Sequence, residues 1–136
     1  MKKILAVLLA VMMIFSVLSV GTSVAYESDE YTDKVVNKQR GGYCFELNMI
    51  LSWMLKELGF EVKDYFARYL RGEEGIPLRR HRVLVATCND GDYLCDVGVG
   101  KSAPRWPIKM VPGLVQEQFG EIYKLEKDDY FGWVLY

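Results

Sequence analysis

An apolar stripe with helical spacing, closed by glycines on both sides, restricts the fold of this chain more than any other feature of its sequence. Four leucines recur at intervals of four, four and three residues, so they share one face of an α-helix: Leu47, Leu51, Leu55 and Leu58. Gly41-Gly42 marks a turn before the stripe, and Gly59 supplies a C-terminal stop. We therefore expect a helix over residues 44–58, with Cys44 at its first position.

The segments that follow this helix have the composition of strands. Short β-branched or alternating runs predict strands over residues 60–67, 80–88, 93–97 and 122–125, with a loop over residues 72–75. Beyond residue 100, three prolines exclude a long helix: Pro104, Pro107 and Pro112. One helix followed by antiparallel strands is an α+β fold.

The N-terminus has the pattern of a targeting segment. Lys2 and Lys3 precede an apolar run over residues 4–20, and small residues at Ser23 and Ala25 fit a signal-peptidase site. We expect residues 1–25 to be a signal peptide or, if uncleaved, a membrane anchor, so the chain would be secreted or membrane-anchored. Residues 26–39 are rich in acidic groups and are expected to be a linker to a single domain over residues 40–136.

The composition excludes two classes of protein. Lys and Arg together number 17 against 18 Asp and Glu, so the net charge of −1 does not suit a basic nucleic-acid binder, and we expect no nucleic-acid partner. Because 51% of the residues are hydrophobic, the chain has the apolar surface that a disordered protein lacks.

Three residues on this scaffold have the chemistry of a reaction site. Cys44 begins the helix, where the helix dipole favours a thiolate; His81 heads a strand, and Asp96 lies on the expected partner strand. An imidazole stabilises a thiolate as an ion pair, and a carboxylate orients the imidazole. Arg40 is expected to brace the loop before the cysteine by pairing with Glu46. The residues alone leave open whether Cys44 is a nucleophile or a buried core thiol.

The hairpin between the two strands sets a geometric condition on this site. If Asp90-Gly91 is a two-residue turn, Asp96 faces Val85, about 13 Å along the strand from His81. We therefore expect a longer or bulged loop over residues 89–92 if the carboxylate is to reach the imidazole.

Other motifs in the sequence predict no further site. Three cysteines and one histidine lack the paired spacings of a structural zinc site, so no metal is expected. Gly100-Lys101-Ser102 resembles the end of a P-loop, but Cys95 stands at the first required glycine. Cys88 and Cys95 lie diagonally on the expected hairpin, where either a disulfide or two packed thiols fits.

Four segments together resemble the arylamine N-acetyltransferase family. R-G-G-Y-C-F-E-L-N from Arg40 and L-G-F-E-V from Leu58 are similar to the family's active-site loop and helix. H-R-V-L from His81 and Y-L-C-D-V-G-V-G from Tyr93 are similar to its histidine and aspartate blocks. The motifs occur in the family's order over about 60 residues, which makes the resemblance specific.

The resemblance implies a fold and a site. The fold would be the cysteine-protease-like N-acetyltransferase core, in which an active-site helix is followed by antiparallel strands of a partial barrel. Cys44 would be the nucleophile, His81 the general base and Asp96 the group that orients the histidine.

The resemblance also implies a reaction. An acetyl group would move from acetyl-CoA to the cysteine as a thioester, and then to an arylamine or hydrazine nitrogen, in a ping-pong sequence. Backbone N–H groups near Cys44 would stabilise the oxyanion. Acetyl-CoA is a cosubstrate, so we expect no bound cofactor, and small molecules are the expected partners.

The sequence departs from the family in three respects. Val99 stands where the family commonly has phenylalanine. The resemblance covers roughly residues 40–127, about half of a usual member, without the helical region before the cysteine or the lid domain after the strands. Members of this family are cytoplasmic, as is acetyl-CoA, which conflicts with the expected export.

These departures leave two alternatives open. The chain could be a non-catalytic exported or membrane-tethered remnant of the fold, or a thiol hydrolase or amide synthase that uses the same triad.

Overall fold

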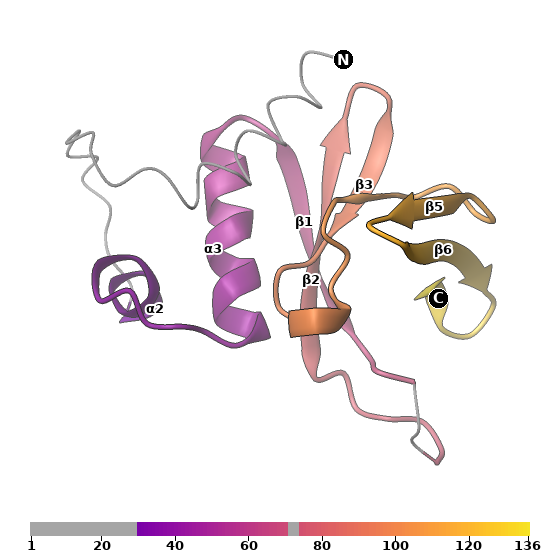
Figure 1. Cartoon of the computed structure of the whole chain (residues 1–136), viewed down its shortest axis with the longest axis horizontal. Helices are drawn as coiled ribbons and strands as arrows, with labels where there is room; N and C mark the ends of the chain where they lie inside the picture. The colour runs from indigo at the N-terminus through magenta and orange to yellow at the C-terminus, as the bar shows by residue number, and fades with distance from the viewer. Residues whose placement is uncertain (1–29, 71–73) are drawn as a thin grey trace.

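The computed structural model describes residues 30–70 and 74–136, and it has the expected α+β architecture (Figure 1). The helical elements are α2 (Glu30–Thr32), the π-helical turn η1 (Asp33–Asn37), α3 (Cys44–Glu57) and the 3₁₀ turn η2 (Gly100–Ser102). The strands are β1 (Glu61–Ala67), β2 (His81–Cys88), β3 (Gly91–Cys95), β4 (Ile108–Lys109), β5 (Val115–Gln118), β6 (Glu121–Asp128) and β7 (Gly132–Leu135).

The main helix, α3, begins and ends close to where the sequence predicts. It runs from Cys44 to Glu57, one residue short of the predicted end. Gly59 adopts a positive φ of 84°, and its N–H donates to the carbonyl of Lys56 at 2.9 Å. A residue without a Cβ takes this conformation at little cost, so the glycine closes the helix and turns the chain into β1.

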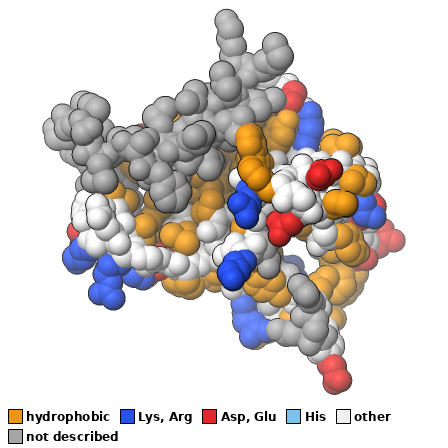
Figure 2. All heavy atoms as spheres, viewed as in Figure 1, with side chains coloured by type: hydrophobic (Ala, Val, Ile, Leu, Met, Phe, Trp, Pro, Cys, Tyr) orange, Lys and Arg blue, Asp and Glu red, His pale blue; other side chains and the backbone are white. Residues whose placement is uncertain are grey.

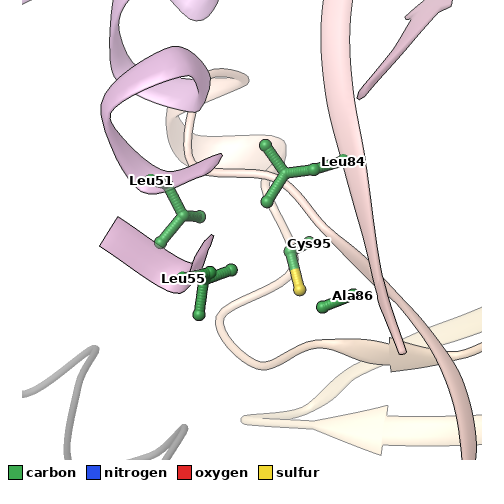
Figure 3. Packing of buried hydrophobic residues seen from close by; sticks show 5 residues of the cluster. All are labelled: Leu51, Leu55, Leu84, Ala86 and Cys95. Carbon is green, nitrogen blue, oxygen red and sulfur yellow. The ribbon is translucent and has the colours of Figure 1, made fainter. Parts of the chain in front are cut away.

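The apolar stripe of α3 packs on a four-stranded antiparallel sheet with the order β1-β2-β3-β4. The side chains of this contact are all buried: Leu51, Leu55, Leu84, Ala86 and Cys95. Figure 3 shows the two helix leucines pointing at the three residues from the sheet. Burial of each leucine is worth about 2 kcal/mol, so this contact fixes the helix on the sheet.

A second sheet, with the order β5-β6-β7, makes a separate layer beyond the first one (Figure 1). Its buried residues Tyr123 and Leu125 pack with Ile108 from β4, and Leu94 from β3 lies against them. The strands pair as two distinct sheets in the described part of the chain, so they do not close a barrel there. Prediction from the sequence found β6 but missed β4, β5 and β7.

The second sheet leaves many apolar side chains on the surface. Phe119 and Ile122 are each 67% exposed, and Figure 2 shows apolar and charged side chains mixed on this side of the molecule.

Within residues 30–70 and 74–136, no helix has the length and apolar character needed to cross a bilayer. The predicted targeting segment, residues 1–25, lies outside the described residues. Part of the predicted linker is described, and it is helical over α2 and η1.

Candidate active site

The first turn of α3 holds Cys44 in place through an ion pair on its neighbour Glu46. The Tyr43 N–H donates to Glu46 Oε2 at 3.0 Å, and Lys34 Nζ donates to both carboxylate oxygens, at 2.9 and 2.8 Å. The hydrogen bond from Lys34, and then that from the Tyr43 N–H, lowers the pKa of Glu46. A charged carboxylate at this position suits the positive end of the helix dipole.

The brace on this turn differs from the one expected. The sequence predicts that Glu46 pairs with Arg40, which is exposed in the structure. The structure gives Glu46 to Lys34 on η1, and the Arg40 backbone N–H donates to the Lys34 carbonyl at 3.1 Å. The helical turn over η1 brings Lys34 back onto α3. No local sequence pattern predicts this contact between Lys34 and Glu46, which are twelve residues apart.

His81 and Asp96 form a buried pair beside this helix end. His81 Nε2 and Asp96 Oδ2 are 2.6 Å apart, and the two side chains are only 4% and 8% exposed. The sulfur of Cys44 lies 3.9 Å from the carbonyl oxygen of Arg80, the residue next to His81. The three residues that the sequence singles out are therefore brought together, where α3 and β2 begin and the chain leaves β3 (Figure 1).

The electrostatics of the site favour the imidazolium form of His81. Burial disfavours the charged ring, but the carboxylate of Asp96 and then the thiol of Cys44 favour it more strongly, so the pKa of His81 is raised. Nε2 is committed to Asp96, and Nδ1 has no hydrogen-bond partner among the residues that the structure describes. The pair thus leaves one buried ring nitrogen available for proton exchange with the thiol.

The hairpin that carries Asp96 corrects the sequence prediction. It has no longer or bulged loop: Cys88 pairs with Gly91 around the two-residue turn Asn89-Asp90. This turn is one residue earlier than the one considered from the sequence, which moves the position opposite Asp96 from Val85 to Val83. Asp96 then lies diagonally from His81, and since it has left β3, its carboxylate reaches the ring.

Asn48 is a site residue that sequence analysis missed. It is completely buried, and its Nδ2 donates to Asp96 Oδ1 at 2.9 Å and to the Arg82 carbonyl at 2.6 Å. Its Oδ1 accepts the Val97 N–H at 3.0 Å. The signal in the sequence was a polar residue one helical turn after Cys44, among apolar neighbours. Asn48 therefore fixes the carboxylate that holds His81.

Replacing Asn48 with alanine is expected to destabilise the protein by about 2 kcal/mol, because it leaves buried polar groups without partners. We also expect the substitution to disturb the alignment of His81 and Asp96 more than it disturbs the fold as a whole. Urea denaturation measures the first effect, with Asn37→Ala at an exposed position as the control. A free energy of unfolding equal to that of the control variant would contradict this role for Asn48.

The raised pKa of His81 predicts how its charge varies with pH. Protonation of His81 stabilises the folded state fully below pH about 6.5, the value for an unperturbed imidazole, and this contribution is lost as pH rises through the folded-state pKa. His81 is the only histidine in the chain, so NMR follows it as a single imidazole. We expect a midpoint above 6.5 that falls in Asp96→Asn. A midpoint at or below 6.5 in the unmodified protein would contradict the ion-pair geometry.

Gly98 allows α3 to approach the segment after β3. A Cβ placed on Gly98 would lie 2.5 Å from Cys44 Cα and 2.6 Å from Cys44 Cβ. These are shorter than any normal contact, so only glycine fits against the start of the helix. The glycine of the D-V-G segment thus sets how closely the cysteine and the aspartate meet.

The structure also describes the remaining motifs of the sequence. Within the described part of the chain, no group of three metal-binding side chains comes together. All three cysteines are thiols, and burial, followed by the charge of Cys88, raises the pKa of Cys95 to about 12. The P-loop-like residues 100–102 form only a single 3₁₀ turn.

Comparison with known proteins places the chain in a family. The profile of a family described as N-acetyltransferase matches residues 14–136. The chain is 40% identical over 108 residues to an arylamine N-acetyltransferase of Mycobacterium bovis, covering 76% of this chain and 38% of the relative. It is 38% identical over 105 residues to the Escherichia coli enzyme of that name, covering 76% of this chain and 37% of the relative.

Solved structures give the same result for the fold. The structure of the Mycobacterium marinum arylamine N-acetyltransferase in complex with CoA superposes with a TM-score of 0.71 at 36% identity, covering 77% of this chain and 40% of that one. The Salmonella typhimurium enzyme superposes with a TM-score of 0.71 at 30% identity, covering 77% and 38%. The chain thus spans about two fifths of the length of the relatives that it matches.

Proposed function

The chain belongs to the arylamine N-acetyltransferase family, and we propose that it moves an acetyl group from acetyl-CoA, through a thioester on Cys44, to an arylamine or hydrazine nitrogen. The observation that carries the proposal is the 2.6 Å contact between His81 Nε2 and Asp96 Oδ2 beside the helix end that begins with Cys44. The CoA complex of the M. marinum relative supports acetyl-CoA as the donor.

The first half of the reaction loads the cysteine. The Cys44 thiolate attacks the carbonyl carbon of acetyl-CoA, and the resulting oxyanion is stabilised by N–H groups of the first turn of α3, which have no partner within the helix. The bond to the CoA sulfur breaks, and the departing thiolate takes the proton held by His81. The products are an acetyl thioester on Cys44 and free CoA.

The second half transfers the acetyl group to the acceptor. The amine nitrogen attacks the thioester carbonyl while neutral His81 takes a proton from the amine. The carbon–sulfur bond then breaks and regenerates the Cys44 thiolate beside the imidazolium. Asp96, held by Asn48, keeps Nε2 of His81 engaged throughout the reaction. Nδ1 is therefore the ring nitrogen that exchanges protons in both halves.

A turnover assay tests this function. The purified chain is incubated with acetyl-CoA and an arylamine, and the acetylated amine is quantified by chromatography, with Cys44→Ala as the control. We expect product from the unmodified chain alone. No product from a folded chain would favour the non-catalytic alternative, and release of CoA without acetylated amine would favour the hydrolase.

A further inference from the structure

An aromatic side chain outside the triad lies against the catalytic histidine. Tyr69, in the segment that follows β1, places its ring centroid 5.0 Å from that of His81, with the two rings inclined by 40°. Tyr69 is 45% exposed, whereas the His81 side chain is only 4% exposed. The tyrosine therefore stands between the imidazole and solvent.

The contact with Asp96 alone does not fix the orientation of the His81 ring. The Nε2 contact with Asp96 fixes one end of the imidazole, but a single hydrogen bond allows the ring to turn about that bond. A second ring whose centroid lies 5.0 Å away, inclined by 40°, restricts this rotation, and an aromatic ring this close to an imidazolium also stabilises the positive charge. Excluding water strengthens the attraction between the imidazolium and a thiolate.

The phenol group of Tyr69 does not suit an acid–base role. Burial, followed by the charges of Asp96 and Cys44, raises the pKa of Tyr69, so its hydroxyl stays protonated at neutral pH. Asp96 and Cys44 also act on the charge of His81, and the Tyr69 ring lies beside the imidazole. The aromatic ring, rather than the hydroxyl, is then the part of Tyr69 that acts on His81.

We propose that Tyr69 is a positioning residue that covers His81 and holds its ring in the plane from which Nδ1 serves Cys44. The inference rests on the proposed function only in taking Cys44 as the nucleophile that His81 activates. It concerns a residue that lies outside the four segments that identify the family, because Tyr69 precedes the histidine block by twelve positions.

Two substitutions separate the ring from the hydroxyl. Tyr69→Phe keeps the aromatic face, and Tyr69→Leu removes it. Tyr65→Leu is the matched control. Tyr65 is 49% exposed, and it lies in β1, four residues before Tyr69, where it pairs with Val83 rather than with His81. Tyr69→Val is a second variant without a ring, for use if the leucine variant does not fold, and circular dichroism checks each fold.

Alkylation of Cys44 by iodoacetamide is the first readout, and it needs no acyl donor or amine. Cys44 falls in a tryptic peptide over residues 41–56, separate from that of Cys88 and Cys95 over residues 83–101, so mass spectrometry follows it alone. We expect Tyr69→Leu to slow alkylation of Cys44 by about three- to tenfold, the effect of losing a cation–π contact. Tyr69→Phe and Tyr65→Leu should alkylate at the unmodified rate.

The Nε2 proton of the single histidine is the second readout. In the unmodified protein and in Tyr69→Phe, we expect it as a slowly exchanging downfield NMR signal, and in Tyr69→Leu we expect exchange with water to remove it. A merely structural tyrosine would change stability without changing this signal. The proposal is overturned if the leucine variant keeps both the signal and the alkylation rate, or if the phenylalanine variant loses them.

The outcomes distinguish this inference from the proposed function. A chain that shows no acetyl transfer but retains the alkylation pattern would refute the function and support the role of Tyr69. If the unmodified chain and Tyr69→Leu transfer acetyl groups at equal rates and are alkylated at equal rates, the function is supported and the role of Tyr69 is refuted.

Discussion

His81→Gln is expected to slow acetylation of Cys44 by about 10³-fold or more, because the thiol loses both the group that takes its proton and the positive charge that holds the thiolate. Glutamine has a similar volume and can still donate to Asp96, so the loss isolates proton transfer from packing. The buried pair at 2.6 Å is the structural basis of this expectation. Rapid-quench mass spectrometry with acetyl-CoA measures the rate.

Asp96→Asn provides a graded comparison for this variant. It keeps the shape of the side chain and its contact with Asn48, but removes the charge beside the imidazole. We expect acetylation at a rate between those of the unmodified protein and His81→Gln. A glutamine variant that acetylates within tenfold of the unmodified rate would contradict the role assigned to the histidine.

Gly98→Ala is expected to disrupt both stability and the site. The added methyl group would lie 2.5 Å from the backbone of Cys44 and 2.9 Å from Nδ2 of Asn48, so α3 must shift as a unit. Overpacking of this kind costs about 1–3 kcal/mol. A displacement near 1 Å between reacting groups lowers activity by about 10²-fold, so acetylation should fall further than stability alone explains.

The matched control for this variant is Gly41→Ala. Gly41 lies in the loop just before α3, its φ is not positive, and a Cβ there meets no atom within 4 Å. Denaturant unfolding and the acetylation rate are measured for both variants. We expect the control to stay within about 0.5 kcal/mol of the unmodified protein. Equal behaviour of the two variants would contradict the close approach at Gly98.

The parts of the fold that depend on local signals were predictable from the sequence. The spacing of the leucines and the glycine at residue 59 located α3 to within one residue of its end. The β-branched run around Leu84 likewise located β2. In both cases the pattern is complete within the element itself, because burial of one face dictates the periodicity.

The parts that depend on distant contacts were not predictable. Residues 89–92 allow a two-residue turn at either of two positions, and moving the turn by one residue moves the position opposite Asp96 by two. The prediction of a longer or bulged loop is therefore wrong, because the turn at Asn89-Asp90 already brings Asp96 within reach of His81. β4 and β7 are short strands defined by their partners. Asn48 and Lys34 act through contacts across 48 and 12 residues, which no periodicity reports.

The sequence nevertheless selected the three residues that the structure brings together. Cys44 was found from its place at a helix start, and His81 from being the only histidine in the chain. What the sequence lacked was the support around them: Asn48 behind Asp96, Gly98 against Cys44 and Tyr69 over His81. Each of these contacts exists only after the helix and the hairpin have packed.

The mass of the intact protein after brief exposure to acetyl-CoA, in the absence of an amine, is the most direct measurement of how this chain works. The account predicts a gain of one acetyl group, located on the peptide over residues 41–56 and absent from Cys44→Ala. An unchanged mass in the folded protein, or an equal gain in Cys44→Ala, would contradict it.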